Sequence, residues 1–84
     1  MEKCERVIVT LRIQHAAYDL ELPAFLPVSE LKRRILETLL YVDPGRYSGI
    51  RGLELYFDGK PLPGNRHLAS FGVWDGSVLD GRLI

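Results

Sequence analysis

The chain of 84 residues is 46% hydrophobic and 26% charged, which indicates one compact domain over residues 1–84 and excludes a second hydrophobic core. Eleven basic and eleven acidic residues cancel, so no overall charge draws the protein to nucleic acid or to an anionic membrane. The single cysteine, Cys4, cannot form an internal disulfide, and no apolar run reaches the roughly 18 residues that span a bilayer. We therefore expect a cytoplasmic protein without direct membrane insertion, and a frayed N-terminus at residues 1–4.

The chain opens with two predicted strands. Residues 5–14 alternate in character and place four apolar side chains on one face: Val7, Val9, Leu11 and Ile13. After a polar break, a second alternating pattern runs from Tyr18 to Pro23. The two patterns predict an antiparallel hairpin, but the turn lacks an Asn-Gly or Gly-Gly pair, which leaves the register open.

A helix is predicted from Pro27 onward, because Pro27 fixes φ in the first turn and Glu30 suits the N-terminal dipole. Five residues at helical spacing should face the sheet: Val28, Leu31, Ile35, Leu39 and Val42. Leu36 and Leu40 form a second apolar flank. The outward face carries a basic cluster: Lys32, Arg33 and Arg34. The triplet at 43–45, Asp-Pro-Gly, ends the helix.

The rest of the chain is rich in turn residues. We expect, in order, an irregular connection over 45–52, a strand over 53–57, at most a very short edge strand over 60–62, a helical turn over 67–71 and a last strand over 77–84. One helix that covers one face of a small mixed sheet makes an α+β roll.

The run LELYFDGKPLPGNRHLASFGVWDGSVLDGRLI, residues 53–84, resembles the C-terminal half of ubiquitin-like domains. Nine anchors match that pattern by type and spacing: Phe57, Gly59, Lys60, Leu62, Leu68, Phe71, Val73, Ser77 and Leu79. The resemblance covers nearly the whole chain. It implies a ubiquitin-like β-grasp fold, with a mixed sheet of four to five strands and one main helix packed on one face.

The earlier run YDLELPAFLPVSELKRRILETL looks most like the bacterial YukD/EsaB proteins, which accompany the type VII (WXG100 or ESX-like) secretion apparatus of Gram-positive bacteria. The similar features are a strand that ends in Leu-Pro, a Pro-Val helix start and a chain of about 80 residues. The resemblance implies a non-enzymatic cytoplasmic adaptor or regulatory component. Its partner would be a protein of the secretion machinery.

Two other classes of function stay as alternatives. Ubiquitin-type modifiers and sulfur carriers are activated at a flexible tail that ends in Gly-Gly. This chain ends Gly-Arg-Leu-Ile, with Leu83 and Ile84 inside the strand pattern, so we expect no conjugation. A small oligomerisation module, with weak self-association through exposed residues, is the second alternative.

Residues capable of catalysis or metal binding are scattered along the chain. The stretch 59–65 lacks the order of a phosphate-binding loop, and its two prolines remove amide donors. His15 and His67 have no serine, cysteine or acid in a recognisable arrangement. Three aspartates belong to separate turns or strands: Asp58, Asp75 and Asp80. We expect no catalytic residue, no cofactor and no metal site.

The first candidate protein-binding surface is the sheet face opposite the helix. In ubiquitin-like domains this face recruits partners through an apolar patch, and the resemblance places Tyr56 at its centre. Arg82 stands where ubiquitin has an aliphatic residue, and with Glu54 it makes the patch polar. Ordinary ubiquitin receptors are therefore not expected to bind. An isolated exposed aromatic is the alternative interpretation of Tyr56.

Trp74 and the helix flank are the other candidate surfaces. Trp74 precedes a turn, where packing over the sheet edge and a binding hot spot are both open interpretations. Leu36 and Leu40 bind a partner if no other segment covers them. A solvated helix face is the default for Lys32 and Arg33, with an acidic partner as the alternative. We expect no nucleic-acid partner, because no exposed aromatics alternate with the basic residues.

Overall fold

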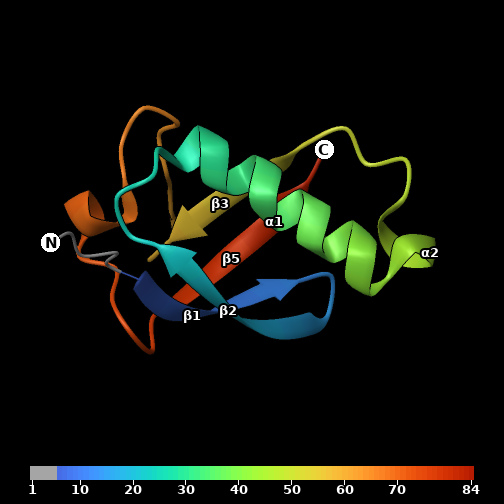
Figure 1. Cartoon of the computed structure of the whole chain (residues 1–84), viewed down its shortest axis with the longest axis horizontal. Helices are drawn as coiled ribbons and strands as arrows, with labels where there is room; N and C mark the ends of the chain where they lie inside the picture. The colour runs from blue at the N-terminus through green and yellow to red at the C-terminus, as the bar shows by residue number, and fades with distance from the viewer. Residues whose placement is uncertain (1–5) are drawn as a thin grey trace, which may run out of the picture.

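The computed structural model describes residues 6–84, so the expected frayed residues 1–4, with Cys4, lie outside the described part of the chain. The elements in chain order are β1 (Arg6–Ile13), β2 (Ala16–Pro23), α1 (Val28–Val42), α2 (Pro44–Tyr47), β3 (Leu53–Phe57), β4 (Lys60–Pro61), the 3-10 helix η1 (Leu68–Phe71) and β5 (Val78–Leu83). Five strands and one main helix confirm the predicted α+β roll (Figure 1).

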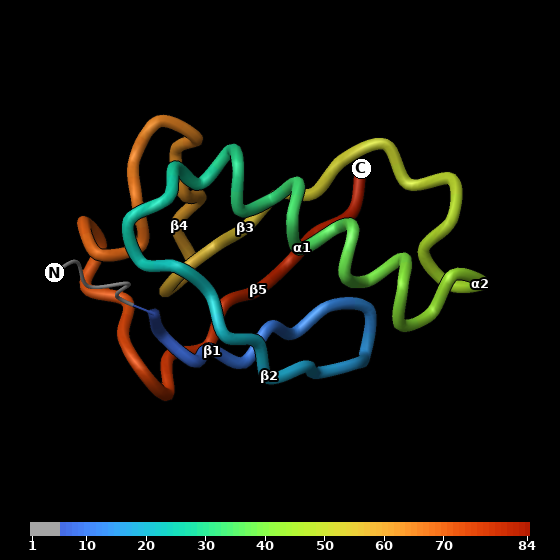
Figure 2. The backbone as a smooth tube through the Cα atoms, viewed as in Figure 1, coloured from blue at the N-terminus to red at the C-terminus, as the bar shows by residue number. Residues whose placement is uncertain are grey.

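The five strands form one mixed sheet in the order β2-β1-β5-β3-β4. β5 lies at the centre and runs parallel to β1, whereas the other neighbouring pairs are antiparallel. α1 crosses one side of this sheet, as Figures 1 and 2 show, and we call the opposite side the open face. The eight-residue strand β2 and the two-residue strand β4 form the two edges.

The β1–β2 hairpin turns through Gln14 and His15, whose φ values are 47° and 66°. A two-residue turn with positive φ matches the twist of the strands it joins. Ile13 pairs with Ala16 beside the turn, so β2 begins two residues before the alternating pattern from Tyr18. The register is thus set by a turn that contains no glycine.

The hydrophobic core lies between α1 and the sheet. Four of the five helix residues predicted to face inward are buried: Val28, Leu31, Ile35 and Leu39. The inward position predicted for Val42 is wrong, because its side chain is exposed. α1 ends at Val42, and the chain turns away through Asp43 into α2, so the last residue of the helix extends past the sheet.

The segment predicted to be irregular begins with the short helix α2. Asp43 caps α2 by accepting a hydrogen bond from the amide N–H of Arg46 at 3.2 Å, and Pro44 suits the first turn. Tyr47, at the end of α2, is fully buried in the core. Tyr47 is a core residue that the sequence did not indicate, since a tyrosine among glycines and arginines carries no periodic signal.

The remaining elements lie where the sequence placed them. β3, β4, η1 and β5 all fall within the predicted ranges, and α1 ends at the expected Asp-Pro-Gly triplet. None of the helices in residues 6–84 combines the length and the apolar character needed to cross a bilayer.

Candidate protein-binding surfaces

The middle of the open face is built by β3 and β5. Their antiparallel register places Tyr56 opposite Asp80, and Glu54 opposite Arg82. The guanidinium carbon of Arg82 lies 5.2 Å from the centroid of the Tyr56 ring, so the cation covers part of the aromatic surface. Tyr56 is half-buried and Arg82 is exposed. The two side chains form one amphipathic surface in place of the aliphatic patch of ubiquitin.

The charged residues around this contact are paired with other residues of the chain. Asp80 accepts a hydrogen bond from Nε of Arg12 at 3.1 Å, between neighbouring strands. Glu54 has Nζ of Lys32, on α1, at 3.8 Å, so its ion-pair partner is Lys32 and not Arg82. Exposed ion pairs of this kind contribute little stability, but they reduce the free charge offered to a partner.

One end of the open face is apolar. Two large hydrophobic side chains of the strands are exposed there, Ile8 (51% exposed) and Val78 (41%), and Trp74 (69%) is exposed in the turn that leads into β5. The amide N–H of Ile8 donates to the Asp75 carboxylate at 2.8 Å, and the carbonyl of Ile8 accepts from the N–H of Gly76 at 2.8 Å. These bonds attach the turn after Trp74 directly to β1. We call Ile8, Trp74 and Val78 the apolar end.

The backbone of Trp74 is held in place by Ser77. The N–H of Trp74 donates to Oγ of Ser77 at 3.0 Å, and the N–H of Ser77 donates to the carbonyl of Trp74 at 2.9 Å. The indole is mostly exposed, so little of it packs over the sheet. Sequence reasoning selected Trp74 but missed Ile8 and Val78, whose only signal is an apolar residue on the outward side of a strand.

The helix flank divides into two parts. Leu40 is half-buried and packs against the core. Leu36 lines a shallow groove of about 330 Å³ beside Leu53 and Ile84, with Lys32 and Arg33 on its rim. Leu36 is half-buried like Leu40, and of the two only Leu36 lines this groove.

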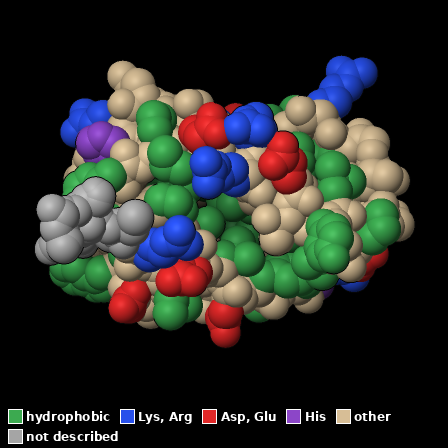
Figure 3. All heavy atoms as spheres, in the orientation of Figure 1, with side chains coloured by type: hydrophobic (Ala, Val, Ile, Leu, Met, Phe, Trp, Pro, Cys, Tyr) green, Lys and Arg blue, Asp and Glu red, His purple; other side chains and the backbone are tan. Residues whose placement is uncertain are grey.

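The basic cluster of α1 is paired with acidic residues of the same helix. Arg33 binds Glu30 and also Glu37, the latter at 3.1 Å, and Nε of Arg34 lies 3.6 Å from Glu30. The hydrogen bond from Arg33 lowers the pKa of the Glu30 carboxyl, and the same bond raises the pKa of the Arg33 guanidinium. Figure 3 shows these acidic and basic side chains interspersed on the helix surface. The cluster offers little unpaired positive charge.

The two histidines lie apart. His15 is exposed at the tip of the hairpin. His67 contacts a serine locally, since its Nδ1 lies 3.1 Å from Oγ of Ser70 across the first turn of η1. The contact is local, and no acid of residues 6–84 hydrogen-bonds the imidazole, so the orienting group of a nucleophile triad is absent there. Within the same residues, no three potential metal ligands lie together.

The strand order and the single main helix define a ubiquitin-like β-grasp domain, as the resemblance of residues 53–84 implied. Residues 6–80 match the model of a family described as "WXG100 protein secretion system (Wss), protein YukD". Because this match covers most of the chain, the chain belongs to the YukD family. It is a ubiquitin-like domain of a family associated with type VII secretion.

Solved structures share this fold. The ubiquitin-like domain of EccD5 from Mycobacterium xenopi has a TM-score of 0.79 at 22% identity, over 95% of this chain and 96% of that one. The ubiquitin-like domain of the Mycobacterium tuberculosis type VII secretion system protein EccD1 has a TM-score of 0.74 at 24% identity, over 92% and 97%. A chain of the MycP5-free ESX-5 inner membrane complex has a TM-score of 0.77 at 24% identity, but this protein covers only 21% of that chain. No curated protein matches the sequence.

Proposed function

We propose that the protein is a non-enzymatic adaptor or regulatory component of a type VII secretion system in the cytoplasm of a Gram-positive bacterium. It binds a protein of the secretion machinery through its surface and is not conjugated to that partner. The observation that carries this proposal is the apolar end, in a member of the YukD family: Ile8 and Val78 are exposed on the face that α1 leaves uncovered, and Trp74 is exposed in the turn bonded to Ile8.

The chemistry of the apolar end suits protein binding. Clusters of large exposed apolar side chains are typical of interaction sites, and tryptophan is frequent among the residues that dominate binding energy. The turn of Trp74 is already ordered by its bonds to Ser77 and Ile8, so binding orders little additional backbone. Tyr56 and Arg82 continue the same face as a more polar rim.

The helix flank supports a binding role less well. Leu40 packs against the core, and Lys32 and Arg33 are both engaged by carboxylates of the same chain. Leu36 alone offers too small an apolar surface to anchor a partner. We therefore assign the main contact to the open face, with Tyr56 and Trp74 as its aromatic residues.

The proposal is tested by affinity capture from the cytoplasm of the native organism, with quantitative mass spectrometry of the captured proteins. The wild type is compared with the double variant Ile8→Ser, Trp74→Ala. The control variant is Lys60→Ala, which replaces an exposed residue of the edge strand β4. We expect the wild type and Lys60→Ala to recover a secretion component. The double variant should recover at least about tenfold less, since hot-spot residues each contribute more than about 1 kcal/mol.

Two results would contradict the proposal. One is a wild-type capture that contains no protein of the secretion machinery. The other is a covalent adduct at the C-terminal carboxylate, detected by mass spectrometry of the purified protein, which would instead establish a modifier or sulfur carrier.

A further inference from the structure

The two edges of the sheet differ in how open they are. β4 contributes only Lys60 and Pro61 to its edge, and a short strand with a lysine and a proline resists pairing with another chain. β2 forms the other edge over Ala16–Pro23 and pairs with β1 in an uninterrupted register along its whole length. A long, regular edge strand is a template for strand addition.

The backbone groups of Ala17, Asp19 and Glu21 point away from the sheet. The N–H of Thr10 donates to the carbonyl of Ser77 at 2.9 Å, next to β5. The even-numbered residues of β1 therefore direct their backbone N–H and C=O groups toward β5. Because alternate residues direct their backbone groups to opposite sides, the odd-numbered residues of β1 bond to their even-numbered partners in β2. The odd-numbered residues of β2 keep a free N–H and C=O at the edge, and no hydrogen bond within residues 6–84 uses these groups.

A groove of about 350 Å³ runs beside this edge, between β2 and α1. Leu20, Leu22 and Ile35 supply its apolar lining, and Arg34 and Thr38 border it on the helix side. Figure 3 shows it as a hollow below the charged side chains of α1, with hydrophobic side chains along it. The helix backbone approaches β3 more closely than β2, which leaves this part of the sheet less covered.

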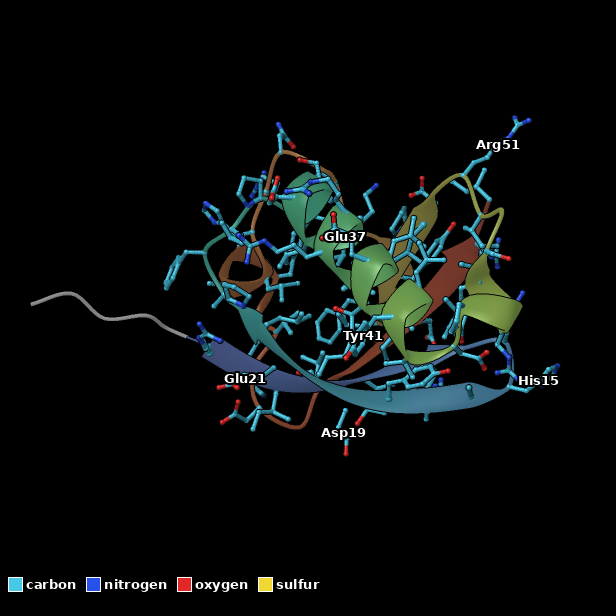
Figure 4. The ribbon with its side chains drawn as sticks, turned by 45° about the vertical axis from the view of Figure 1, so that its right-hand side comes forward. His15, Asp19, Glu21, Glu37, Tyr41 and Arg51 are labelled. Atoms are coloured by element: carbon cyan, nitrogen blue, oxygen red, sulfur yellow. The ribbon has the colours of Figure 1, made fainter. Side chains whose placement is uncertain are left out.

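The side chains of the edge are acidic on one side only. Asp19 and Glu21 point to the open face, away from α1 (Figure 4). Neither carboxylate takes part in an ion pair within residues 6–84, although Oδ1 of Asp19 accepts a hydrogen bond from the Thr10 hydroxyl at 2.9 Å. Of the cations that line the groove, Arg34 is held by Glu30, and Arg6, on β1, pairs in register with Pro23, two residues beyond Glu21, and forms no ion pair within residues 6–84. The edge thus offers unpaired negative charge toward the open face and apolar surface toward the helix.

We propose that β2 accepts an extended segment of a partner protein as a sixth strand, and that this segment alternates basic and apolar residues. Its lysines or arginines lie beside Asp19 and Glu21, since opposite charges on neighbouring strands stabilise pairing. Its apolar side chains enter the groove against Leu20, which is half-buried, whereas Leu22 and Ile35 are buried behind it. Glu21 lies opposite Ile8 in the β1–β2 register, so this surface adjoins the apolar end. The free backbone edge of β2 and the groove beside α1 are not part of the apolar end, so the inference does not require the partner proposed for the open face.

A second copy of this chain does not fit the same edge. Two β2 strands related by a two-fold axis would pair antiparallel and place Asp19 and Glu21 of one copy beside those of the other. Like charges on neighbouring strands destabilise pairing. The charge of the edge therefore selects a basic strand from a different protein.

The test uses the full chain and a synthetic peptide of about eight residues, long enough to span β2, that alternates lysine with valine or isoleucine. A matched peptide carries glutamate at every lysine position. We expect saturable binding of the lysine peptide below about 1 mM in an NMR titration, and markedly weaker binding of the glutamate peptide. The amide signals of Ala17, Asp19 and Glu21 should shift, and their hydrogen exchange should slow, as a strand-addition contact requires.

Two variants separate the charge effect from a general change in net charge. Glu21→Lys should weaken binding of the lysine peptide about fivefold and favour the glutamate peptide instead. Asp58→Lys makes the same charge change in the exposed turn between β3 and β4, at the opposite edge of the sheet from β2, and should alter the affinity less than about twofold. Circular dichroism checks that both variants are folded.

Three results would overturn the proposal. The first is no saturable binding of the lysine peptide, or equal binding of the glutamate peptide. The second is peptide binding that shifts the signals of Ile8 and Trp74 while leaving those of β2 unchanged. The third is a wild-type dimer in which the amides of Ala17, Asp19 and Glu21 are already protected without peptide.

Discussion

The hydroxyl groups of Tyr18 and Tyr47 lie 2.9 Å apart and join the edge strand β2 to the short helix α2. Their rings meet edge to face, with centroids 6.4 Å apart and an interplanar angle of 64°. Tyr47 is fully buried and Tyr18 is half-buried. The contact closes the core at the end where α1 stops, and it fixes the first half of β2 beside the hairpin turn.

Removal of the Tyr47 hydroxyl should cost measurable stability. We expect Tyr47→Phe to lower the free energy of unfolding by about 1 kcal/mol, the usual net value of a hydrogen bond. Tyr47→Ala should lower it by about 3–5 kcal/mol, because it also leaves a cavity. Urea unfolding at neutral pH measures both. Tyr41→Phe is the matched control, since Tyr41 is 89% exposed, and a loss as large as that of Tyr47→Phe would contradict the assignment.

The hydrogen bond between Tyr18 and Tyr47 also predicts that the free energy of unfolding depends on pH. The hydrogen bond with Tyr47 raises the pKa of the Tyr18 phenol above its ordinary value of 10.0, so the folded state holds this proton more tightly than the unfolded state. The resulting stability is fully present below about pH 10 and is lost as pH rises through the higher folded pKa. Urea unfolding across this alkaline range should show the decline, and Tyr47→Phe should make it shallower. An unchanged slope in that variant would remove Tyr18 as the cause.

The fold could be predicted where periodic patterns decide the structure. The alternation in residues 5–14 and the helical spacing from Val28 to Leu39 follow directly from which side chains are buried. The predictions failed where a tertiary contact decides. Val42 continues the helical pattern but lies past the sheet, so its side chain is exposed. Tyr47 is buried in the core, where it contacts Tyr18, a residue far away in the sequence.

The candidate site was predictable only in part for the same reason. The strand register that brings Tyr56 and Arg82 together on one face follows from the alternation of β3 and β5, whereas the pairing of Glu54 with Lys32 on α1 does not. The exposed Ile8 becomes part of a candidate binding surface only because the turn at Asp75 is bonded to it in the folded chain. No sequence pattern indicates that contact. The sequence pattern likewise does not indicate which residues of distant segments form ion pairs.

Asp75 should affect partner binding at the apolar end indirectly, by attaching the turn of Trp74 to β1. Its carboxylate accepts the N–H of Ile8, so Asp75→Ala should lower the free energy of unfolding by about 1 kcal/mol and speed hydrogen exchange at the Ile8 amide. It should also weaken partner capture, because the turn of Trp74 loses one of the two hydrogen bonds that attach it to Ile8. Trp74→Ala should weaken capture while changing the unfolding free energy by less than about 0.5 kcal/mol. If Asp75→Ala left capture and exchange unchanged, the turn would not depend on this bond.

Gly81 marks a close approach between β5 and β1 under the helix. A Cβ at this position would lie 3.1 Å from Cδ1 of Ile13 and 3.2 Å from Cδ1 of Leu11. Both neighbours are ends of side chains that can shift, so we expect Gly81→Ala to cost about 1 kcal/mol, the low end of the range for overpacking. Gly45→Ala is the control, since its nearest neighbour would be 3.9 Å away, and it should be neutral or slightly stabilising.

A double-mutant cycle tests whether crowding is the cause of that loss. Ile13→Val removes the Cδ1 atom closest to the new methyl group, so the double variant Gly81→Ala, Ile13→Val should be more stable than the sum of the two single changes predicts. The unfolding free energies of the four proteins are measured under one set of conditions. Strict additivity would show that the contact with Cδ1 of Ile13 is not the cause of the loss.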